Sequence, residues 1–308
     1  MDKKKRTPGV ALTEGFLRLN GRLPLGYHYF WGRVFAWLMR SVLHYRSDVV
    51  MTNLARSFPD KKYGELKAIS KRFYAHLGDI IAEAVWFAGC RGERGVRRFR
   101  KQGLVEFTNP EVINRIYAAG SSAVVMSSHA GNWELLGCFI SAGPGEPVQV
   151  AAKDMHVVYK RLSSDFWDAV MGDNRCSLVA HTDFDGYVES RSVLRSAVMR
   201  RGEPSVYVFP TDQYPYKGAA SYDIGTFLCQ DTKALAGGAA LASRFGMAVV
   251  YMRWEAVERG KYRVTFVPVS DDASGEEPAS LMRKFYDLLE QDIAACPHNY
   301  LWTHKRWK

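Results

Sequence analysis

Several features that identify common classes of site are missing from this sequence. Its five cysteines are scattered, and no C-x-x-C pair occurs, which argues against zinc-finger and thiol-redox sites. No G-x-S-x-G elbow marks a nucleophilic serine, and no metal or nucleotide fingerprint is present. We therefore expect neither a metal ion nor another cofactor. Scattered cysteines without a secretory signal indicate reduced thiols in the cytosol.

The chain also lacks an uninterrupted apolar run long enough to cross a bilayer, which takes about 20 residues. Its most apolar segment, residues 23–45, is rich in aromatics but interrupted by Arg33 and Arg40. This pattern predicts a helix lying in the membrane interface, with its aromatic face inward and its cations toward lipid phosphates. The alternative is a core helix of a soluble protein whose arginines reach outward. The flanking Lys and Arg favour the cytoplasmic leaflet.

The net charge of the chain limits the kinds of binding partner to expect. The 308 residues carry a net charge of +10 and are 47% hydrophobic. This composition allows a sizeable core and favours anionic partners such as nucleic acid, acidic lipid headgroups or an acidic carrier protein. No nucleic-acid motif is visible, so we expect no nucleic-acid partner. A basic run at residues 91–101 is either a solvated linker or a docking patch for a lipid phosphate or an acidic carrier.

Two regions are predicted from the hydrophobic pattern. Residues 1–46 would form a loosely ordered basic N-terminus followed by the interfacial helix, and residues 47–308 one catalytic domain that starts with a helical hairpin at 47–89. Beyond it, strand and helix patterns alternate, which is typical of an α/β fold with a mostly parallel sheet covered by helices on both faces. Residues 214–227 are expected to form a mobile loop. The predicted strands are 104–107, 123–126, 148–152, 177–179, 206–209, 248–252 and 262–267.

The stretch at residues 123–141 places a candidate catalytic residue, His129, directly after a predicted strand. A buried-strand pattern leads into a turn holding His129, and Gly131 and Asn132 there are typical of a turn and a helix N-cap. Five residues separate His129 from Glu134, which is about 140° around one continuous helix. The two can meet only if His129 lies on the loop and Glu134 in the first helical turn. Glu134 could then orient the imidazole as a base; the alternative is a histidine that only caps backbone groups.

The segment S-H-x-G-N-W-E at residues 128–134 resembles the signature of the bacterial lipid A late acyltransferases, a branch of the lysophospholipid acyltransferase superfamily. Further segments are similar to that family: N-L-x-x-S-F-P at 53–59, F-L-C-Q-D-T at 227–232 and the tail L-W-x-H-K-R-W-K. The resemblance covers residues 53–308. It implies that His129 is the base and Glu134 its support, with Asn132 among the substrate-binding candidates.

The resemblance also assigns roles to residues farther along the chain. Residues 153–156 are similar to a basic–x–M–H segment of the family, and Arg175 stands where the family has an arginine important for activity. A cation beside His129 can hold a phosphate or stabilise the oxyanion of a tetrahedral intermediate. Lys153 is therefore a substrate-binding candidate and Arg175 a catalytic one, although Arg175 could instead complement a helix dipole.

A P-T-D-Q segment at residues 210–213 follows another predicted strand and is similar to a P-D-Q segment of the family, whose aspartate lies near the catalytic histidine. Asp212 could bind acceptor hydroxyls or order the site, or it could be an ordinary turn residue. Asp212 and Gln213 are therefore substrate-binding candidates.

The resemblance implies a membrane-associated O-acyltransferase on the cytoplasmic face of the bacterial inner membrane. It would move a fatty acyl chain from a thioester of acyl carrier protein, or of coenzyme A, onto a lipid hydroxyl of a lipid A precursor. His129 would deprotonate that hydroxyl, while backbone N–H groups near Gly131 and the guanidinium of Arg175 would stabilise the oxyanion. Three alternatives remain: another acceptor, such as an aminolipid, glycolipid or lysophospholipid; a lipid hydrolase or thioesterase that activates water; or a non-enzymatic lipid- or nucleic-acid-binding protein explained by charge alone.

Overall fold

A seven-stranded sheet organises the described part of the chain, which comprises residues 7–139, 146–184, 187–215, 219 and 221–307 of the computed structural model. The spatial order of its strands is β1-β9-β8-β2-β5-β3-β4. Their bounds are β1 Val105–Phe107, β2 Ala123–Ser127, β3 Met155–Tyr159, β4 Val188–Glu189, β5 Val206–Pro210, β8 Ala248–Glu258 and β9 Lys261–Ser270.

Five of these strands, β8, β2, β5, β3 and β4, run parallel to one another. Strand β9 pairs antiparallel with β8, and β1 pairs parallel with β9. The prediction of a mostly parallel sheet is confirmed. Strands β2 and β5 lie in register, with Ser127 opposite Pro210. Both therefore end at the same edge of the sheet, and the segments that follow them begin side by side.

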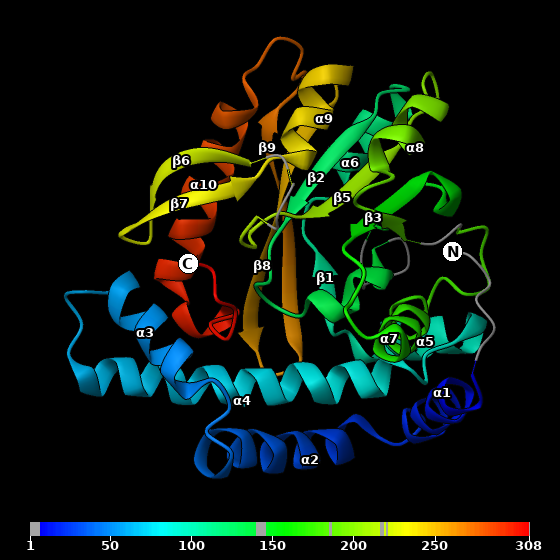
Figure 1. Cartoon of the computed structure of the whole chain (residues 1–308). Coiled ribbons are helices and arrows are strands. Elements are labelled where there is room, and N and C mark those ends of the chain that lie inside the picture. Colours follow the sequence, from blue (N-terminus) through cyan, green and yellow to red (C-terminus); the bar gives the residue numbers. More distant parts are fainter. Residues whose placement is uncertain (1–6, 140–145, 185–186, 216–218, 220, 308) are drawn as a thin grey trace.

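Helices cover both faces of the sheet (Figure 1). Strand β2 is buried throughout, and its side chains alternate: Val124 and Met126 join one apolar cluster, whereas Val125 joins the other. The first cluster includes α8 (Val193–Met199), α9 (Gly237–Phe245) and α10 (Pro278–Ala295). The second includes α5 (Gly92–Gln102) and α6 (Glu111–Ala118). A strand buried on both sides needs a continuous apolar run, which residues 123–126 supply.

The N-terminal third of the chain forms a helical layer at the bottom of Figure 1. It comprises α1 (Pro8–Asn20), α2 (Leu25–Trp37), a π-helical turn (Leu38–Val42), α3 (Ser47–Ser57) and the long α4 (Tyr63–Phe87). Helices α2 and α4 touch through small residues: a Cβ on Gly32 would lie 2.6 Å from the carbonyl oxygen of Gly78. This close approach fixes α2 against α4, so α4 separates α2 from the sheet.

The predicted helical hairpin at 47–89 is confirmed by α3 and α4, and the helical prediction for residues 23–45 is confirmed by α2 and its π-helical extension. The expectation of a loosely ordered N-terminus is wrong for residues 7–20: they form α1 and its N-cap Thr7, whose side chain accepts from the backbone N–H of Val10. Residues 1–6 lie outside the described residues. No helix in the described ranges is both long and apolar enough to cross a membrane.

Several strand predictions differ from the structure. Residues 148–151 are irregular and lead through a short 3-10 turn (Ala152–Asp154) into β3, and residues 177–179 form turns after α7 (Asp165–Arg175). Both segments are apolar because they are buried, and burial alone does not distinguish a strand from a packed loop. The expected loop at 214–227 contains β6 (Ser221–Phe227), which forms a hairpin with β7 (Gln230–Leu235); residues 216–218 and 220 lie outside the described residues.

Candidate active site

The turn after β2 carries His129 and is locked by its neighbours. Gly131 has φ +65°, and a Cβ there would come within 2.8 Å of the Trp254 side chain, so only glycine fits. Asn132 is the N-cap of the next helix, and its side chain accepts from the backbone N–H of Glu134 at 3.1 Å. The predicted turn and cap are therefore confirmed. The helix itself, Trp133–Cys138, is of the 3-10 type and has Phe139 as its C-cap; residues 140–141 of the expected helix lie outside the described residues.

The backbone N–H groups of this turn are already used inside the protein. Those of His129, Ala130 and Gly131 donate to Asp212, Ser128 and Asn299 respectively. Our expectation that N–H groups near Gly131 form an oxyanion site is therefore not met for residues 129–131. These bonds hold the turn rather than face a substrate.

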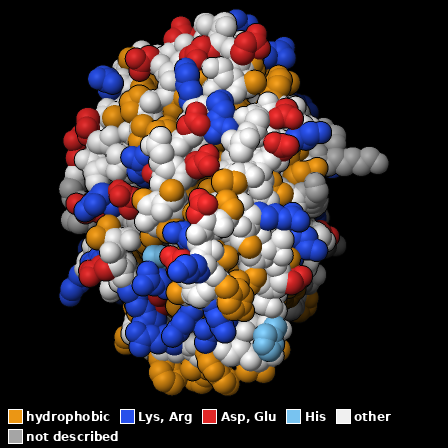
Figure 2. Space-filling model, turned by 90° about the vertical axis from the view of Figure 1, so that its left-hand side faces the viewer, with side chains coloured by type: hydrophobic (Ala, Val, Ile, Leu, Met, Phe, Trp, Pro, Cys, Tyr) orange, Lys and Arg blue, Asp and Glu red, His pale blue; other side chains and the backbone are white. Residues whose placement is uncertain are grey.

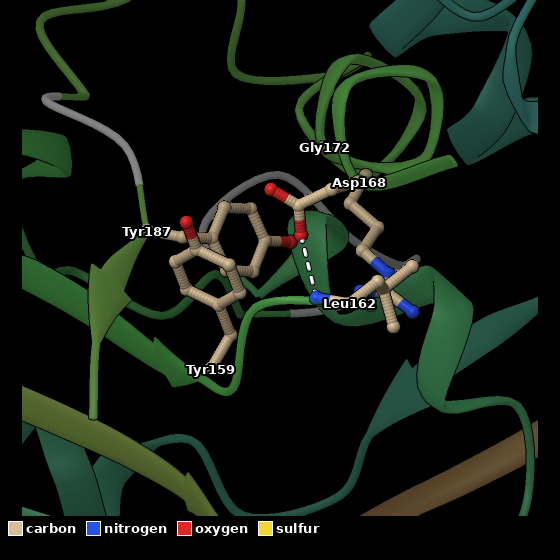
Figure 3. Close-up of a pocket in the computed structure, with 6 residues that line it drawn as sticks. Tyr159, Leu162, Asp168, Gly172 and Tyr187 are labelled. Carbon is tan, nitrogen blue, oxygen red and sulfur yellow. Dashed lines mark hydrogen bonds between the residues drawn. The ribbon is translucent and has the colours of Figure 1, made fainter. Parts of the chain in front are cut away.

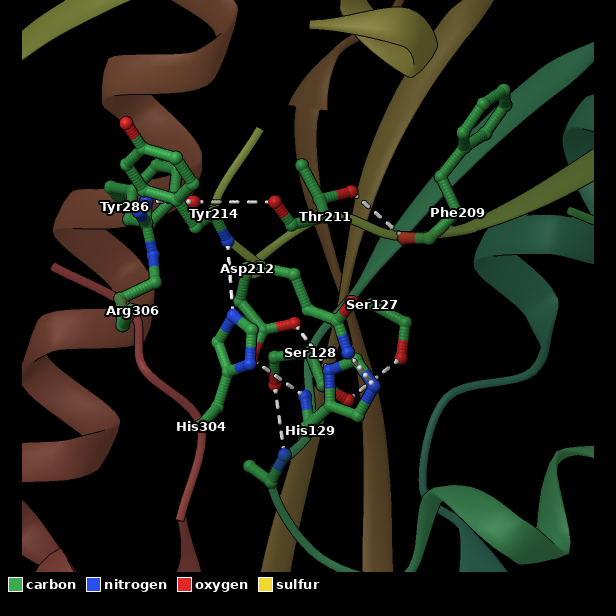
Figure 4. A network of polar contacts seen from close by, with 12 residues as sticks. Ser127, Ser128, His129, Phe209, Thr211, Asp212, Tyr214, Tyr286, His304 and Arg306 are labelled. Carbon is green, nitrogen blue, oxygen red and sulfur yellow. Dashed lines mark hydrogen bonds and ion pairs between the residues drawn. The ribbon is translucent and has the colours of Figure 1, made fainter. Parts of the chain in front are cut away.

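The catalytic candidate His129 is held by Asp212, which follows β5 at the same edge of the sheet (Figure 4). One carboxylate oxygen of Asp212 lies 2.7 Å from Nδ1 of the imidazole, and the other accepts the backbone N–H of His129 at 3.0 Å. The Asp212 side chain is only 3% exposed, whereas that of His129 is 13% exposed. The Asp212 carboxylate thus binds both the imidazole and the backbone of His129, and the imidazole is still partly exposed at the surface.

The protonation of the pair follows from these contacts. Burial alone would raise the pKa of Asp212, but the adjacent His129 and the N–H donors outweigh it and hold this pKa below its ordinary value. An ionised Asp212 accepts from Nδ1–H, which leaves Nε2 of His129 as an acceptor. The Gln213 amide nitrogen lies 3.1 Å from Nε2 and donates to it. A substrate hydroxyl would take the place of this amide.

Glu134 does not contact the imidazole, which corrects our expectation that it orients His129. Its two carboxylate oxygens instead accept from Nε and one terminal nitrogen of Arg175, each at 2.7 Å. The reason is geometric: Asp212 comes from a neighbouring strand end and takes the Nδ1 side of the ring, while Glu134 meets the last residue of α7. Glu134 and Arg175 thus form a bidentate pair of their own.

Arg175 stays cationic in this pair. Burial would lower its pKa, but attraction to the Glu134 carboxylate is stronger and raises it above the ordinary value. Beside the guanidinium lies a pocket of about 20 Å³, lined also by Tyr159, Leu162 and Tyr187 (Figure 3). This volume has room for about one water molecule, not for an acyl chain. The buried hydroxyl of Tyr187 has no hydrogen-bond partner among the described residues.

Lys153 lies far from His129, so its assignment as a substrate-binding residue beside the histidine is wrong. It precedes β3, and Met155 at the start of β3 pairs with Val206 at the start of β5. Lys153 is therefore at the amino edge of the parallel strands, whereas His129 follows their carboxyl edge. Its amino group pairs with Asp154 at 2.9 Å and the side chain is largely exposed. The error arose because the strand was predicted before residue 153 instead of after it.

The C-terminal tail closes the site behind Asp212. Nε2 of His304 accepts the backbone N–H of Tyr214 at 3.2 Å, and the buried Arg306 donates to the hydroxyl of Tyr286 at 2.8 Å (Figure 4). The Asn53 amide on α3 donates to the carbonyl oxygens of Trp302 and His304, both at 2.9 Å. The motif at residues 53–59 thus holds the tail on α3, and the tail in turn bonds to the segment that follows Asp212.

Three residues that order the turn were missed: Glu83, Asn299 and Tyr262. The substrate-binding candidate Asn132 is fully buried, and its amide donates to Glu83 of α4 at 2.7 Å. Asn299 accepts from Gly131 and donates to the carbonyl of Trp254. Tyr262 of β9 also donates to Glu83. The one available signal was Glu83 itself, a carboxylate within the apolar stripe of a long helix.

The comparison with known proteins identifies the family of this chain. A model of the family described as bacterial lipid A biosynthesis acyltransferase matches residues 2–308. The chain belongs to this family. It is an acyltransferase, and its family covers the helical N-terminal layer as well as the α/β core.

Two relatives are similar to this protein over nearly the whole chain. They are the lipid A biosynthesis palmitoleoyltransferase of Escherichia coli (strain K12) and the lipid A biosynthesis acyltransferase of Shigella flexneri. Each is 23% identical over 305 residues, which covers 96% of this chain and 89% of the relative. The acyl chain named for the first relative belongs to that protein.

Proposed function

We propose that this acyltransferase moves a fatty acyl chain from an acyl thioester to a hydroxyl of a lipid A precursor, with His129 as general base. The observation that supports this most is the His129–Asp212 pair at the carboxyl edge of β2 and β5. It supplies a partly exposed ring with an acceptor nitrogen, held by a buried carboxylate. The family and both relatives named above supply the acceptor class.

In the proposed reaction the acceptor hydroxyl replaces the Gln213 amide at Nε2 of His129. The ring takes the hydroxyl proton while the oxygen attacks the thioester carbon, so a C–O bond forms. The tetrahedral intermediate collapses, the C–S bond breaks, and the imidazolium returns its proton to the leaving thiolate. The ionised Asp212 stabilises the imidazolium between these steps. No protein nucleophile is needed.

We further propose that Glu134 acts through Arg175. Two N–H groups of the guanidinium point at Glu134, and a guanidinium has five. The carboxylate would fix the plane of the cation so that its other N–H groups meet an anion, either the reaction oxyanion or a phosphate of the acceptor. Kinetics of Arg175→Ala separate the two: loss of an oxyanion donor lowers kcat, whereas loss of a phosphate contact raises KM.

The helical layer is proposed to lie on the cytoplasmic face of the inner membrane. Helix α1 exposes Leu12, Phe16 and Leu19 along one face, and α2 exposes Phe30 and Trp31 among other apolar side chains. Figure 2 shows apolar side chains along the bottom of the molecule, with Lys and Arg gathered just above them. An apolar base below cations fits an anionic bilayer surface, and a lipid acceptor would then reach the site without entering water.

For the donor we propose acyl carrier protein, with a coenzyme A thioester as the alternative. Helix α5 carries the basic run at residues 91–101 and exposes several cations beside the helical layer, which would suit an acidic carrier. Purified enzyme offered both donors should show a higher kcat/KM with the carrier. That preference should shrink as salt rises, because exposed charge pairs are screened.

The acceptor is identified by lipid mass spectrometry of a deletion strain against its parent. We expect a lipid A species lacking one acyl chain, restored by the wild-type gene but not by His129→Ala. An unchanged lipid A with loss of an acyl chain from another lipid class would reassign the acceptor. Release of free fatty acid from the thioester at the same rate with and without acceptor lipid would indicate a hydrolase instead.

A further inference from the structure

The reaction proposed above leaves one buried carboxylate unused, that of Glu83 on α4. Its side chain is fully buried, and both oxygens are occupied: Oε1 accepts the hydroxyl of Tyr29 at 2.7 Å, and Oε2 accepts the Asn132 amide at 2.7 Å and the hydroxyl of Tyr262 at 2.8 Å. These donors come from α2, the His129 turn and β9. One carboxylate thus joins three segments distant in sequence.

The contact with Asn132 reaches the catalytic turn. Asn132 lies three residues after His129, and its side-chain oxygen caps the helix that carries Glu134 by accepting the Glu134 backbone N–H. Helix α4 approaches the turn a second time through the buried His76, whose ring lies near the backbone of Gly131. His76 and Glu83 are seven residues apart, about two helical turns, and so share one face of α4. This face supports consecutive residues of the turn.

The contact with Tyr29 reaches the outer helix α2. Tyr29 is itself fixed from the other side, because the Arg259 guanidinium lies 4.1 Å from the centre of its ring and donates to its carbonyl at 3.1 Å. Arg259 also pairs with Asp79, one turn before Glu83 on α4. The direct backbone contact of Gly32 with Gly78 lies one turn away. Helix α2 therefore cannot shift on α4 without moving the donor to Glu83.

We propose that Glu83 is a positioning residue for acyl transfer: it holds the His129 turn through Asn132 and, through Tyr29, ties this turn to the membrane-facing helix α2. The inference rests on the proposed function for the reaction it serves. If packing were the only requirement, an apolar side chain would fill this site without the cost of burying a carboxylate. Three convergent donors instead specify where each oxygen lies.

The first test compares Glu83→Met with Glu83→Gln in the full-length enzyme. Methionine removes every acceptor, so we expect kcat to fall by about 10- to 100-fold with KM within about threefold. Glutamine can keep its oxygen toward Asn132 and Tyr262 and donate its amide to the Tyr29 hydroxyl, so it should stay within about threefold of wild type. Equal kcat in both variants and the wild type, or an equal loss in both, would overturn the positioning role.

A reaction-independent measurement separates this inference from the proposed function. Amide hydrogen exchange of peptides covering residues 128–138 should speed up at least tenfold in Glu83→Met and stay unchanged in Glu83→Gln. Exchange of peptides elsewhere in the chain should stay the same in both variants. If the wild type transfers no acyl chain to any lipid, the proposed function fails while this exchange result still stands. Unchanged exchange in Glu83→Met contradicts the hold on the turn whatever the reaction is.

The second test isolates α2 and covers the case in which Glu83→Met fails to fold. Tyr29→Phe removes one hydroxyl and should lower kcat by about three- to tenfold without changing vesicle binding. The matched control is Tyr117→Phe, which also removes a hydroxyl bonded to a carboxylate, that of Asp154, but at the far edge of the sheet; it should keep the wild-type kcat. Equal kcat for Tyr29→Phe and wild type would remove α2 from the proposal.

Discussion

Replacing Asp212 by asparagine tests the assignment of the residue that supports His129. The carboxylate accepts two N–H groups of His129, one per oxygen, at 2.7 and 3.0 Å. An amide of the same shape has only one oxygen, so one of these N–H groups must face an NH₂ group. If the ring loses its acceptor, the proton moves to Nε2 and the nitrogen that should act as base is blocked. Within the described ranges, Asp212 is the carboxylate that bonds to this ring, so its loss also removes the charge that stabilises the imidazolium.

The expected loss in kcat is about 10³- to 10⁴-fold, since the equivalent change in a serine-protease triad costs about 10⁴. This corresponds to about 4–5.5 kcal/mol of transition-state stabilisation. The comparison variant is Glu134→Gln, which keeps one acceptor for Arg175 and leaves both nitrogens of the imidazole with their partners, so its loss should be about 10-fold to 100-fold.

The assay is single-turnover acyl transfer at saturating acceptor, with melting temperature measured in parallel. Our reasoning is refuted if Asp212→Asn keeps kcat within about threefold of the wild type while Glu134→Gln loses 10³ or more. That outcome would return the support of His129 to Glu134.

Three further predictions follow from other parts of the structure. Arg175→Ala leaves the carboxylate of Glu134 without its partner and should lower the free energy of unfolding by about 2–4 kcal/mol. In denaturant titrations, the double variant Glu134→Gln with Arg175→Met should lose less free energy of unfolding than the two single variants lose together. Strict additivity of the two losses would contradict the pairing. Folding raises the pKa of Glu83 from 4.5 to about 7, with burial as the largest cause. The folded protein therefore holds a proton that the unfolded chain releases, stability should fall by about 3 kcal/mol as pH rises from about 4.5 to 7, and this fall should be absent in Glu83→Gln; identical pH profiles of unfolding would contradict it. Phe30→Ser with Trp31→Ser should weaken binding to anionic vesicles by about 10- to 100-fold, while Met199→Ser, an exposed apolar residue on α8, should not; equal binding by both variants would argue against the α2 surface.

Much of the fold was predictable because buried helices and strands need apolar residues at regular spacings, which can be recognised in the sequence. Helix α4 was predicted as the second helix of the hairpin at 47–89, since its apolar stripe is regular and Pro59 separates it from the preceding helix. Strands β2 and β5 were predicted because both are short apolar runs that end in polar turns. Residues 148–152 failed because a buried loop has the same composition, and the β6–β7 hairpin was missed because its side chains are mostly exposed.

The site was predictable as a set of residues but not as a set of contacts. His129, Glu134, Arg175 and Asp212 were all singled out. Which carboxylate meets the imidazole depends on the register of β2 with β5, and Glu134 and Asp212 are equally acidic in sequence. The spacing of His129 and Glu134 favoured the wrong pair. Glu83 carries no motif, because its role depends on three partners that only the fold brings together.

The central claim is tested most directly by acyl transfer in vitro, with purified wild type and His129→Ala offered an acyl carrier protein thioester and a lipid A precursor in anionic vesicles. Mass spectrometry of the acceptor should show the addition of one acyl chain by the wild type. The variant should be slower by about 10²–10⁴-fold while its melting temperature stays unchanged. An acylated product formed equally fast by both proteins, or no acylated precursor with the wild type, would contradict the account.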